Sequence, residues 1–318
     1  MRVASMASRL AAGQEIAGRY RLLSPVPDAL LGERWRVSVD GGPAAHITLL
    51  TPRASLGAAE RDALLGALRD LGHPHAVAVS DAGIHEDLVY VVSAIPQGQS
   101  LRSWLADHRA RDVPVALRDA RLLFDQVTQC LAAAHRCVPP IVHGTTLAES
   151  VSVERRGEVQ LIATVADLGL LALSEPRNVV VPPGADYAQP SPVDDLHGVG
   201  SLLAEMLANV LLASGGDAET LSARLNAARP DVDPSLWKLV QTCVARDLSQ
   251  RPANMGRVRE LIRQAHWTPR ELRAAPSPVR DGPPDPTPTP LPVSLTRARV
   301  VEVVTTPVGP RATPAPEP

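Results

Sequence analysis

The sequence predicts an α+β protein with a small β-rich lobe, a larger helical lobe and a proline-rich tail. Short apolar runs separated by Gly, Pro or Asp fill residues 19–95, and helical periodicity dominates after Gly98. In addition, 14 of the 31 prolines fall within residues 268–318. The expected organisation is therefore a flexible leader over residues 1–17, lobes over 18–97 and 98–267, and a disordered tail over 268–318.

The first lobe is expected to hold five strands and one helix. A turn at Gly41, Gly42 and Pro43 separates the second strand from the third. Leucines between residues 56 and 71 recur at the spacing of one helix face, which predicts the helix. The strands are expected at residues 19–23, 34–39, 45–50, 76–79 and 88–93.

The second lobe is expected to be mostly helical, with two short strands around a turn at Gly157. Ser100 is placed to cap the first helix, which runs to about residue 108. The two strands are expected at residues 151–153 and 159–162. The other helices are expected at residues 117–137, 194–213, 219–227, 234–245 and 253–264.

Composition excludes several classes of function. The chain has 318 residues, of which 45% are hydrophobic and 21% charged, and its net charge of −2 gives no bulk attraction to nucleic acid or anionic membrane. The longest apolar stretch, residues 199–213, contains Glu205 and is too short to cross a bilayer, and no secretory signal is evident. Cys130, Cys137 and Cys243 lack the spacing of a metal or disulfide motif. We therefore expect a cytoplasmic protein without a transmembrane segment.

A set of short motifs occurs in the order and spacing of one known family. The motifs are Gly18-Arg19-Tyr20-Arg21-Leu22-Leu23, His73-Pro74-His75, Tyr90-Val91-Val92 with Gly98-Gln99-Ser100-Leu101, Ile141-Val142-His143, Asp167-Leu168-Gly169, Asp195-Leu196-His197-Gly198-Val199-Gly200 and Asp247-Leu248-Ser249-Gln250-Arg251-Pro252. Together with the β-lobe and the helical lobe, they make residues 18–265 resemble a bacterial Ser/Thr protein kinase domain. The resemblance implies a bilobal protein-kinase-like fold and, in active members, phosphoryl transfer from ATP to a protein hydroxyl.

The cation that active kinases place on the phosphates of ATP is missing. Thr48 stands at the position of the third-strand lysine, and the only lysine of the chain, Lys238, lies in the helical lobe. Leu64 occupies the position of the glutamate that would pair with that lysine. Arg34 or Arg36, on the second strand, could supply a replacement, because a guanidinium can contact phosphate.

The rest of the nucleotide site is also altered. Of the glycine-rich loop only Gly32 survives, so the backbone has little freedom to approach a phosphate. The resemblance places Ser93 at the gatekeeper position of the kinase hinge. The backbone of the next two residues, Ala94 and Ile95, could still form hydrogen bonds with an adenine. Alternatively, the apolar side chains of Leu30, Leu31 and Leu147 fill the cleft.

The catalytic loop has lost its reactive groups. Thr145 replaces the base aspartate, Leu147 the catalytic-loop lysine and Ser150 the metal-binding asparagine. A threonine hydroxyl has no pKa near neutral pH and cannot serve as the base. Asp167 alone persists, and it either holds Mg²⁺ with a nucleotide or is a remnant carboxylate that hydrogen-bonds local backbone. For Asp195 we expect a structural role, bonding the backbone of the former catalytic loop.

Two further departures concern regulation. The run Ala188-Gln189-Pro190 lacks the glutamate that would pair with Arg251, so we expect Asp186 or Asp194 to take its place, or Arg251 to stay hydrated. Between Asp167 and Ala188 there is no threonine, and Ser174 is the only serine. Activation by threonine phosphorylation of this segment is therefore not expected.

These losses predict a catalytically inactive kinase-like domain, a pseudokinase, that acts as a scaffold or regulatory protein-binding module. The tail, with Thr-Pro pairs at Thr287 and Thr289, suits recognition by modular domains. The expected partners are proteins, with an active kinase or a cell-envelope assembly protein as candidates, and not nucleic acid. No cofactor is expected. The alternative is a nucleotide-binding or atypically active Ser/Thr kinase that uses ATP and Mg²⁺.

Overall fold

The computed structural model describes residues 10–27, 29, 31–39, 42–144, 147–157, 160–175, 190–208, 223 and 225–269. The predicted tail lies outside these ranges, apart from Thr268 and Pro269. Part of the predicted leader is described, and it includes the short strand β1 (Glu15–Ile16), which pairs with the next strand.

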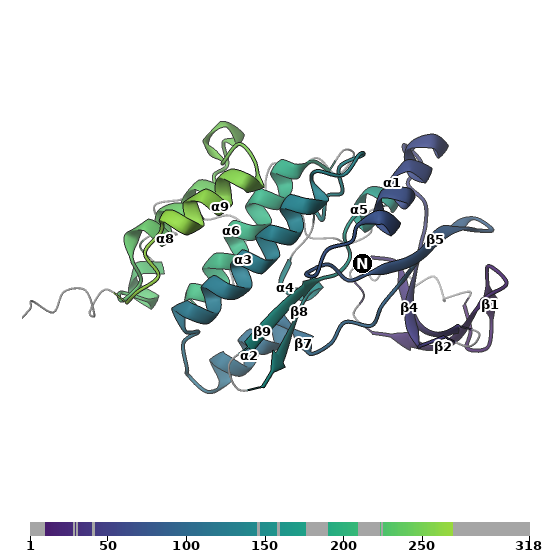
Figure 1. Ribbon diagram of the computed structural model, residues 1–318, viewed down its shortest axis with the longest axis horizontal. Coiled ribbons are helices and arrows are strands. Elements are labelled where there is room, and N and C mark those ends of the chain that lie inside the picture. The colour runs from purple at the N-terminus through teal and green to yellow at the C-terminus, as the bar shows by residue number, and fades with distance from the viewer. Residues whose placement is uncertain are drawn as a thin grey trace, which may run out of the picture. The chain divides into compact units, whose positions relative to one another are not determined.

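The first lobe is an antiparallel sheet of six strands in the order β1-β2-β3-β4-β6-β5, with one helix, α1, beside it (Figure 1). Side chains from one face of the sheet form a separate small core, which contains Ile16, Trp35 and Ile47. The opposite face contributes to the main core, together with α1. The elements after β1 are β2 (Tyr20–Val26), β3 (Glu33–Val39), β4 (Ala45–Leu50), α1 (Ala58–Asp70), β5 (Val79–His85) and β6 (Leu88–Ser93).

The predicted strand at residues 76–79 is wrong. Within this stretch Ala76 makes an isolated bridge to Val165 of the second lobe, and strand β5 begins only at Val79. Strand β5 carries Asp81 among its residues, and the Tyr20 hydroxyl donates to that carboxylate at 2.6 Å. Because the strand is partly polar, it lacks the apolar alternation by which a sequence reveals a strand.

The second lobe contains the longer helices and a three-stranded sheet, β7-β8-β9. Ser100 caps α2 as expected, since its side chain accepts a hydrogen bond from the backbone N–H of Ser103. None of the described helices is both long and apolar enough to cross a membrane. The elements are β7 (Gln99–Ser100), α2 (Leu101–Ala110), α3 (Leu117–Ala134), α4 (Leu147–Ser150), β8 (Val151–Arg156), β9 (Gln160–Val165), α5 (Leu170–Leu173), α6 (Pro192–Ala208), α8 (Pro234–Cys243), η1 (Leu248–Gln250) and α9 (Met255–Gln264).

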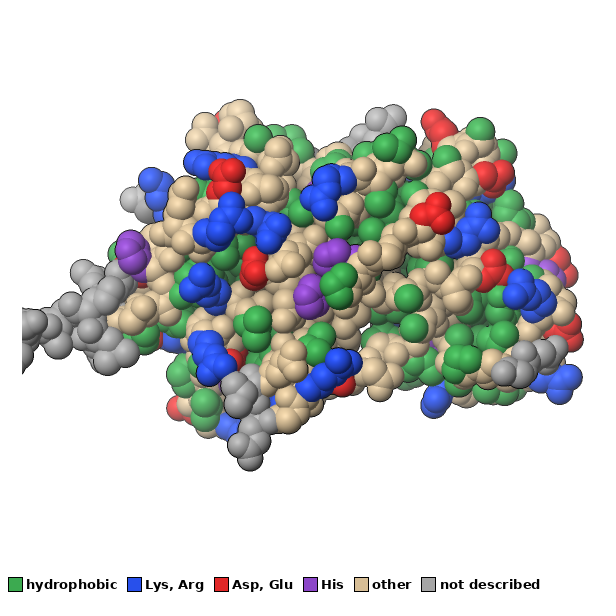
Figure 2. Space-filling model, in the orientation of Figure 1, with side chains coloured by type: hydrophobic (Ala, Val, Ile, Leu, Met, Phe, Trp, Pro, Cys, Tyr) green, Lys and Arg blue, Asp and Glu red, His purple; other side chains and the backbone are tan. Residues whose placement is uncertain are grey.

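Charged side chains of both signs are scattered over the face shown in Figure 2, where arginines gather over the helical lobe. Lys238 is exposed on α8. It does not line the cavity between the lobes, so the only lysine of the chain is not the missing cation.

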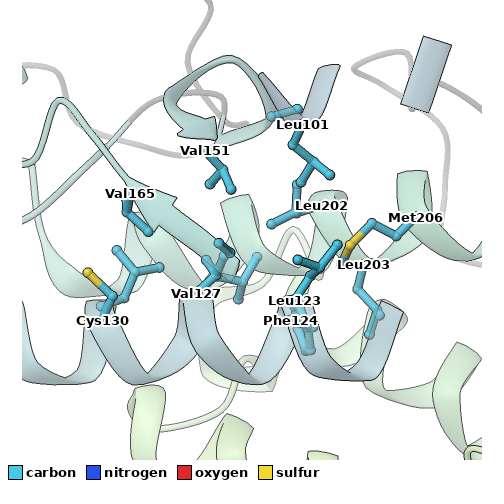
Figure 3. Close-up of a cluster of buried hydrophobic side chains, with 14 of the residues drawn as sticks. Leu101, Leu123, Phe124, Val127, Cys130, Val151, Val165, Leu202, Leu203 and Met206 are labelled. Carbon is cyan, nitrogen blue, oxygen red and sulfur yellow. The ribbon is translucent and has the colours of Figure 1, made fainter. Parts of the chain in front are cut away.

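The core of the second lobe forms where α3 and α6 pack against the small sheet (Figure 3). Leu123, Phe124 and Val127 of α3 are fully buried, and Leu203 and Met206 of α6 are buried beside them. The long apolar stretch that the sequence places near residue 200 is therefore accounted for by this core, as far as the described residues reach.

Candidate functional site

The site begins with two residues that face each other in the β3–β4 hairpin. The register of this antiparallel pair places Arg34 directly opposite Thr48. Thr48 is only 3% exposed, and the Nε of Arg34 donates to its Oγ1 at 3.1 Å. Because opposite residues in an antiparallel pair share one face of the sheet, the arginine reaches the cleft from the strand next to the threonine.

Arg34 continues past Thr48 to the carboxylate of Asp167, with which its Nη2 forms an ion pair. The Ser150 hydroxyl donates to the other carboxylate oxygen at 3.2 Å. Little water reaches the pair, since the two charged side chains are 15% and 7% exposed. The partners of the Asp167 carboxylate are thus two side chains, one from each lobe, rather than the local backbone that the sequence predicted.

Asp167 is itself held in an unusual backbone conformation. Its φ is 60°, in the left-handed region that residues with a Cβ rarely adopt. Strain of this kind persists only where the surroundings impose it. Here the flanking contacts of Ala166 N–H with Ser150 O, at 2.7 Å, and of Gly169 N–H with Val142 O, at 2.9 Å, fix the segment.

The cavity that the described residues enclose at this point has a volume of about 30 Å³. Arg34, Thr48, Leu68, Ser93 and Asp167 are among the residues that line it. Such a volume holds one or two water molecules, whereas pockets for ligands of nucleotide size measure roughly 300 Å³ or more. As lined by the described residues, the cavity is therefore smaller than a nucleotide.

An apolar side chain, Leu64, stands at the position expected for the glutamate partner of the lysine. Leu64 of α1 is 5% exposed, and the short helix α5, directly after the Asp167 triplet, contributes Leu170, Leu171 and Leu173 to the same core. The buried Arg53, after β4, donates from Nη2 to Leu171 O at 2.6 Å. This contact secures α5 against the first lobe.

The loop at the position of the kinase catalytic loop has the structural support that the sequence predicts. Asp195 of α6 accepts hydrogen bonds from the backbone N–H groups of His143 at 3.0 Å and Gly144 at 2.7 Å, as the sequence predicts. His135 lies 2.8 Å from the same carboxylate. Burial acts to raise the pKa of Asp195, but His135 and the backbone donors outweigh it, and the pKa is lowered. Thr145 lies outside the described residues, and Leu147 is described only as the start of α4.

The predicted adenine contacts are partly occupied by the protein itself. The N–H of Ala94 donates to Ala78 O at 2.9 Å, and the carbonyl of Ile95 accepts from the Gln97 side chain at 3.0 Å. Leu31, predicted as a side chain that fills the cleft, is buried in the main core. Leu30 lies outside the described residues.

Packing explains why Gly32 is a glycine. Its φ is +64°, and a Cβ added there would lie 2.2 Å from the carbonyl oxygen of Leu49. Such an approach is impossible for any residue with a side chain. The glycine therefore lets β3 start close to β4, which is a sufficient reason for it without any phosphate.

ATP with Mg²⁺ does not fit the residues that are present. The carboxylate that would hold the metal is paired with Arg34, and Ser150 replaces the second metal ligand. Among the described residues no group of three His, Cys, Asp or Glu side chains is placed to hold a metal ion. We therefore derive no phosphoryl-transfer step from this site.

Sequence reasoning missed the cluster that supports Ser150. Arg102 of α2 lies 2.8 Å from Glu149 of α4 and 3.0 Å from Glu205 of α6, so that one guanidinium joins three helices. Glu149 precedes Ser150 in the chain, so Arg102 helps to position the donor to Asp167. The three residues are far apart in the sequence, and no local pattern marks them.

For Arg251 the sequence predicted an acidic partner or hydration, and the described contacts are with backbone carbonyls. Arg251 is buried, and it donates to Ala245 O at 2.9 Å and to Val193 O at 3.2 Å. Burial lowers the pKa of Arg251, while the charge of Asp194 acts in the opposite direction. Asp186 lies outside the described residues.

Comparison with solved structures decides the fold. The chain superposes on the kinase domain of Mycobacterium tuberculosis PknI with a TM-score of 0.61 and 18% identity, over 80% of this chain and 98% of that domain. This chain has a protein-kinase-like fold. The maize SIRK1 kinase domain bound to AMP-PNP matches with a TM-score of 0.60 and 17% identity, over 76% of this chain and 92% of that one.

Similar sequences point the same way. Streptomyces coelicolor serine/threonine-protein kinase PkaB is 29% identical over 64% of this chain and 50% of its own length. Mouse nuclear receptor-binding protein 2 is 22% identical over 52% of this chain and 36% of its length. The chain thus spans half or less of these curated relatives. No family model matches it.

Proposed function

We propose that this protein is a catalytically inactive kinase-like domain, a pseudokinase, that serves as a scaffold or regulatory protein-binding module in the cytoplasm. The observation that supports it most is the Arg34–Asp167 ion pair, which uses the metal-binding carboxylate for an internal contact. A paired, largely buried carboxylate is a poor ligand, because metal binding would have to break the pair and leave the guanidinium unpaired.

The residues of the catalytic loop support the same proposal. Phosphoryl transfer needs a cation on the phosphates, metal ligands and a group that orients or deprotonates the attacking hydroxyl. Thr48, Thr145 and Ser150 stand at three of these positions, and none of the three carries a charge at neutral pH. The partner would be a protein, with an active kinase or a cell-envelope assembly protein as candidates, and the proline-rich segment after residue 268 would offer one binding region.

A second candidate is a nucleotide-binding module or an atypically active Ser/Thr kinase. It is favoured by the same arginine, because Arg34 enters the cleft from the strand beside Thr48. If its side chain rotated from Asp167 to a phosphate, it would supply the cation and release the carboxylate for a metal ion.

Thermal unfolding with ATP, with and without Mg²⁺ or Mn²⁺, separates the two candidates. A ligand that binds the native state adds about 2.7 kcal/mol of stability at a hundredfold excess over its Kd. We expect no increase in Tm for the wild-type chain, and no phosphate transfer from labelled ATP to a generic protein substrate.

Two variants complete the test. An ATP-dependent rise in Tm that is lost in Asp167→Ala and kept in Asp62→Ala, an exposed carboxylate on α1, would replace the scaffold proposal with nucleotide binding. Phosphate transfer that shows the same dependence on Asp167 would establish the kinase.

A further inference from the structure

A second hollow of the molecule lies on the outer face of the helical lobe, away from the cleft. It is an open groove of about 720 Å³ beside η1 and the start of α9. The charged residues that line it are four arginines and one glutamate: Arg251, Arg257, Arg259, Arg263 and Glu260. Figure 2 shows arginines gathered over α9 and α3 on this face.

Two of these arginines are available for a ligand. Arg257 pairs with Glu260 at 2.7 Å, but both side chains are about half exposed, so solvent screens the pair and a competing carboxylate can replace it. Arg263 is exposed in the last turn of α9 and makes no ion pair with any residue that the structure describes.

Arg259 adds an unsatisfied donor. Its Nη2 lies 3.7 Å from Asp125 of α3, while its Nε is buried and donates to no acceptor among the described residues. Buried nitrogens of this kind normally find a partner. Arg251 differs, since it is directed inward to backbone carbonyls and contributes charge rather than a contact.

The positive field extends beyond the groove. His73 lies before β5, and its pKa is lowered by burial and then by His75, Arg136 and Arg259. Arg136, just after α3, and Arg259 of α9 are thus both close enough to His73 to lower its pKa. Arg136 therefore adds a positive charge in the neighbourhood of Arg259, although the chain as a whole carries a net charge of −2.

We propose that this groove binds an acidic, extended segment of a partner protein, with Arg257, Arg259 and Arg263 holding its carboxylates. A guanidinium presents parallel N–H donors that match a carboxylate, which gives such contacts their geometry. A nucleic acid fits less well, because it carries a phosphate at every nucleotide, whereas a peptide can place neutral residues opposite the two carboxylates, Asp125 and Glu260, that stand among the arginines. The inference names a partner class for the proposed scaffold, and it holds whether or not the cleft binds ATP.

Fluorescence anisotropy with the full chain tests this proposal. The probe is a fluorescein-labelled peptide in which glutamate alternates with glycine, and the reference probes are the same peptide with glutamine and a short single-stranded DNA. The variant is Arg257→Glu with Arg263→Glu. The matched control is Arg21→Glu with Arg36→Glu, which makes the same change of charge at exposed positions of the first lobe.

We expect the glutamate peptide to bind more tightly than the glutamine peptide, and the Kd to rise with salt. The groove variant should weaken binding at least about tenfold, and the control variant should stay within about twofold of the wild type. Equal binding of both peptides, tighter binding of the DNA, or equal losses in the two variants would each overturn the proposal. Circular dichroism and Tm confirm that both variants fold. Failure of the scaffold proposal is read separately, from ATP binding and phosphate transfer.

Discussion

Arg34 and Thr48 face each other across the β3–β4 ladder, and the longer side chain reaches past the shorter one to Asp167. Strand β4 has Thr48 where a kinase has its lysine, and the neighbouring strand β3 supplies a positive charge through Arg34. In this conformation the arginine contacts the carboxylate that would otherwise hold the metal.

Removing the charge of Arg34 should destabilise the chain. Arg34→Met leaves the Asp167 carboxylate, 7% exposed, with only the Ser150 hydroxyl, and losing one partner of a buried pair costs about 3 kcal/mol. Arg34→Met combined with Asp167→Asn should lose less than Arg34→Met alone, because no buried charge is then left over and asparagine tolerates the left-handed φ of this position. Urea unfolding followed by tryptophan fluorescence measures both.

Arg36→Met is the control for this experiment. Arg36 lies two residues further along β3 and is exposed, so its loss should change the free energy of unfolding by less than about 0.5 kcal/mol. A double variant as unstable as the sum of its single changes would show that Arg34 and Asp167 do not interact.

Gly32→Ala should be strongly unfavourable. The added Cβ would meet Leu49 O at 2.2 Å and force a left-handed φ on alanine, which alone costs roughly 1–2 kcal/mol. Gly66→Ala is the opposite case, because Gly66 lies within α1 and a Cβ there meets nothing within 4 Å. That change should stabilise the chain by about 0.5–1 kcal/mol. Comparable losses in both variants would contradict the packing explanation for Gly32.

Glu205 should make stability depend on pH. Burial raises its pKa above the ordinary value of 4.5, against the lowering effect of Arg102. The native state therefore binds more protons than the unfolded state as the pH rises from 4.5 through the native pKa, and the free energy of unfolding falls over that range. Glu205→Gln should lack this fall, so its advantage over the wild type grows with pH and then levels off.

Glu149→Gln tests the cause of that dependence. The charge of Glu149 contributes to the raised pKa of Glu205, and both carboxylates contact Arg102. Its removal should make the fall with pH shallower than in the wild type. An unchanged slope would show that the neighbouring carboxylate has no effect on Glu205. Chemical unfolding at a series of pH values supplies the comparison.

The three cysteines should differ in reactivity toward a thiol reagent. Burial raises the pKa of Cys130 and of Cys243 to about 12, so both stay as protected thiols in the native state. Cys137 is half-buried and should be labelled first, though slowly, since burial raises its pKa as well. Mass spectrometry after partial labelling identifies the site, and early labelling of Cys130 or Cys243 would contradict the buried core.

The sequence predicted the elements with strong periodicity and missed a polar one. The apolar spacing of α1 and α3 and the alternation of β3, β4 and β6 were sufficient to place these elements within a few residues. Strand β5 was misplaced because it is partly polar: it carries Asp81, whose tyrosine donor lies 61 positions away in the chain. Such a contact leaves no trace in local periodicity.

The site divides in the same way. The absence of a lysine at Thr48 and the support of the loop by Asp195 follow from motif positions alone. The use of Arg34 rather than Arg36 could have been read from the hairpin, since a turn centred on Gly41 pairs residue 34 with residue 48. Its contact with Asp167 could not, because 133 positions separate the two residues and only the closure of the lobes brings them together.

The Arg34–Asp167 ion pair joins the two lobes without any bound ligand, and this bears on the conditions under which the domain keeps its conformation. ATP occupancy follows the energy supply of the cell, but a guanidinium carried on the chain stays at the same effective concentration through growth and starvation. We therefore expect the surface that this protein presents to be independent of metabolic state. Its control would then come from how much protein is made, and from when its partners arrive.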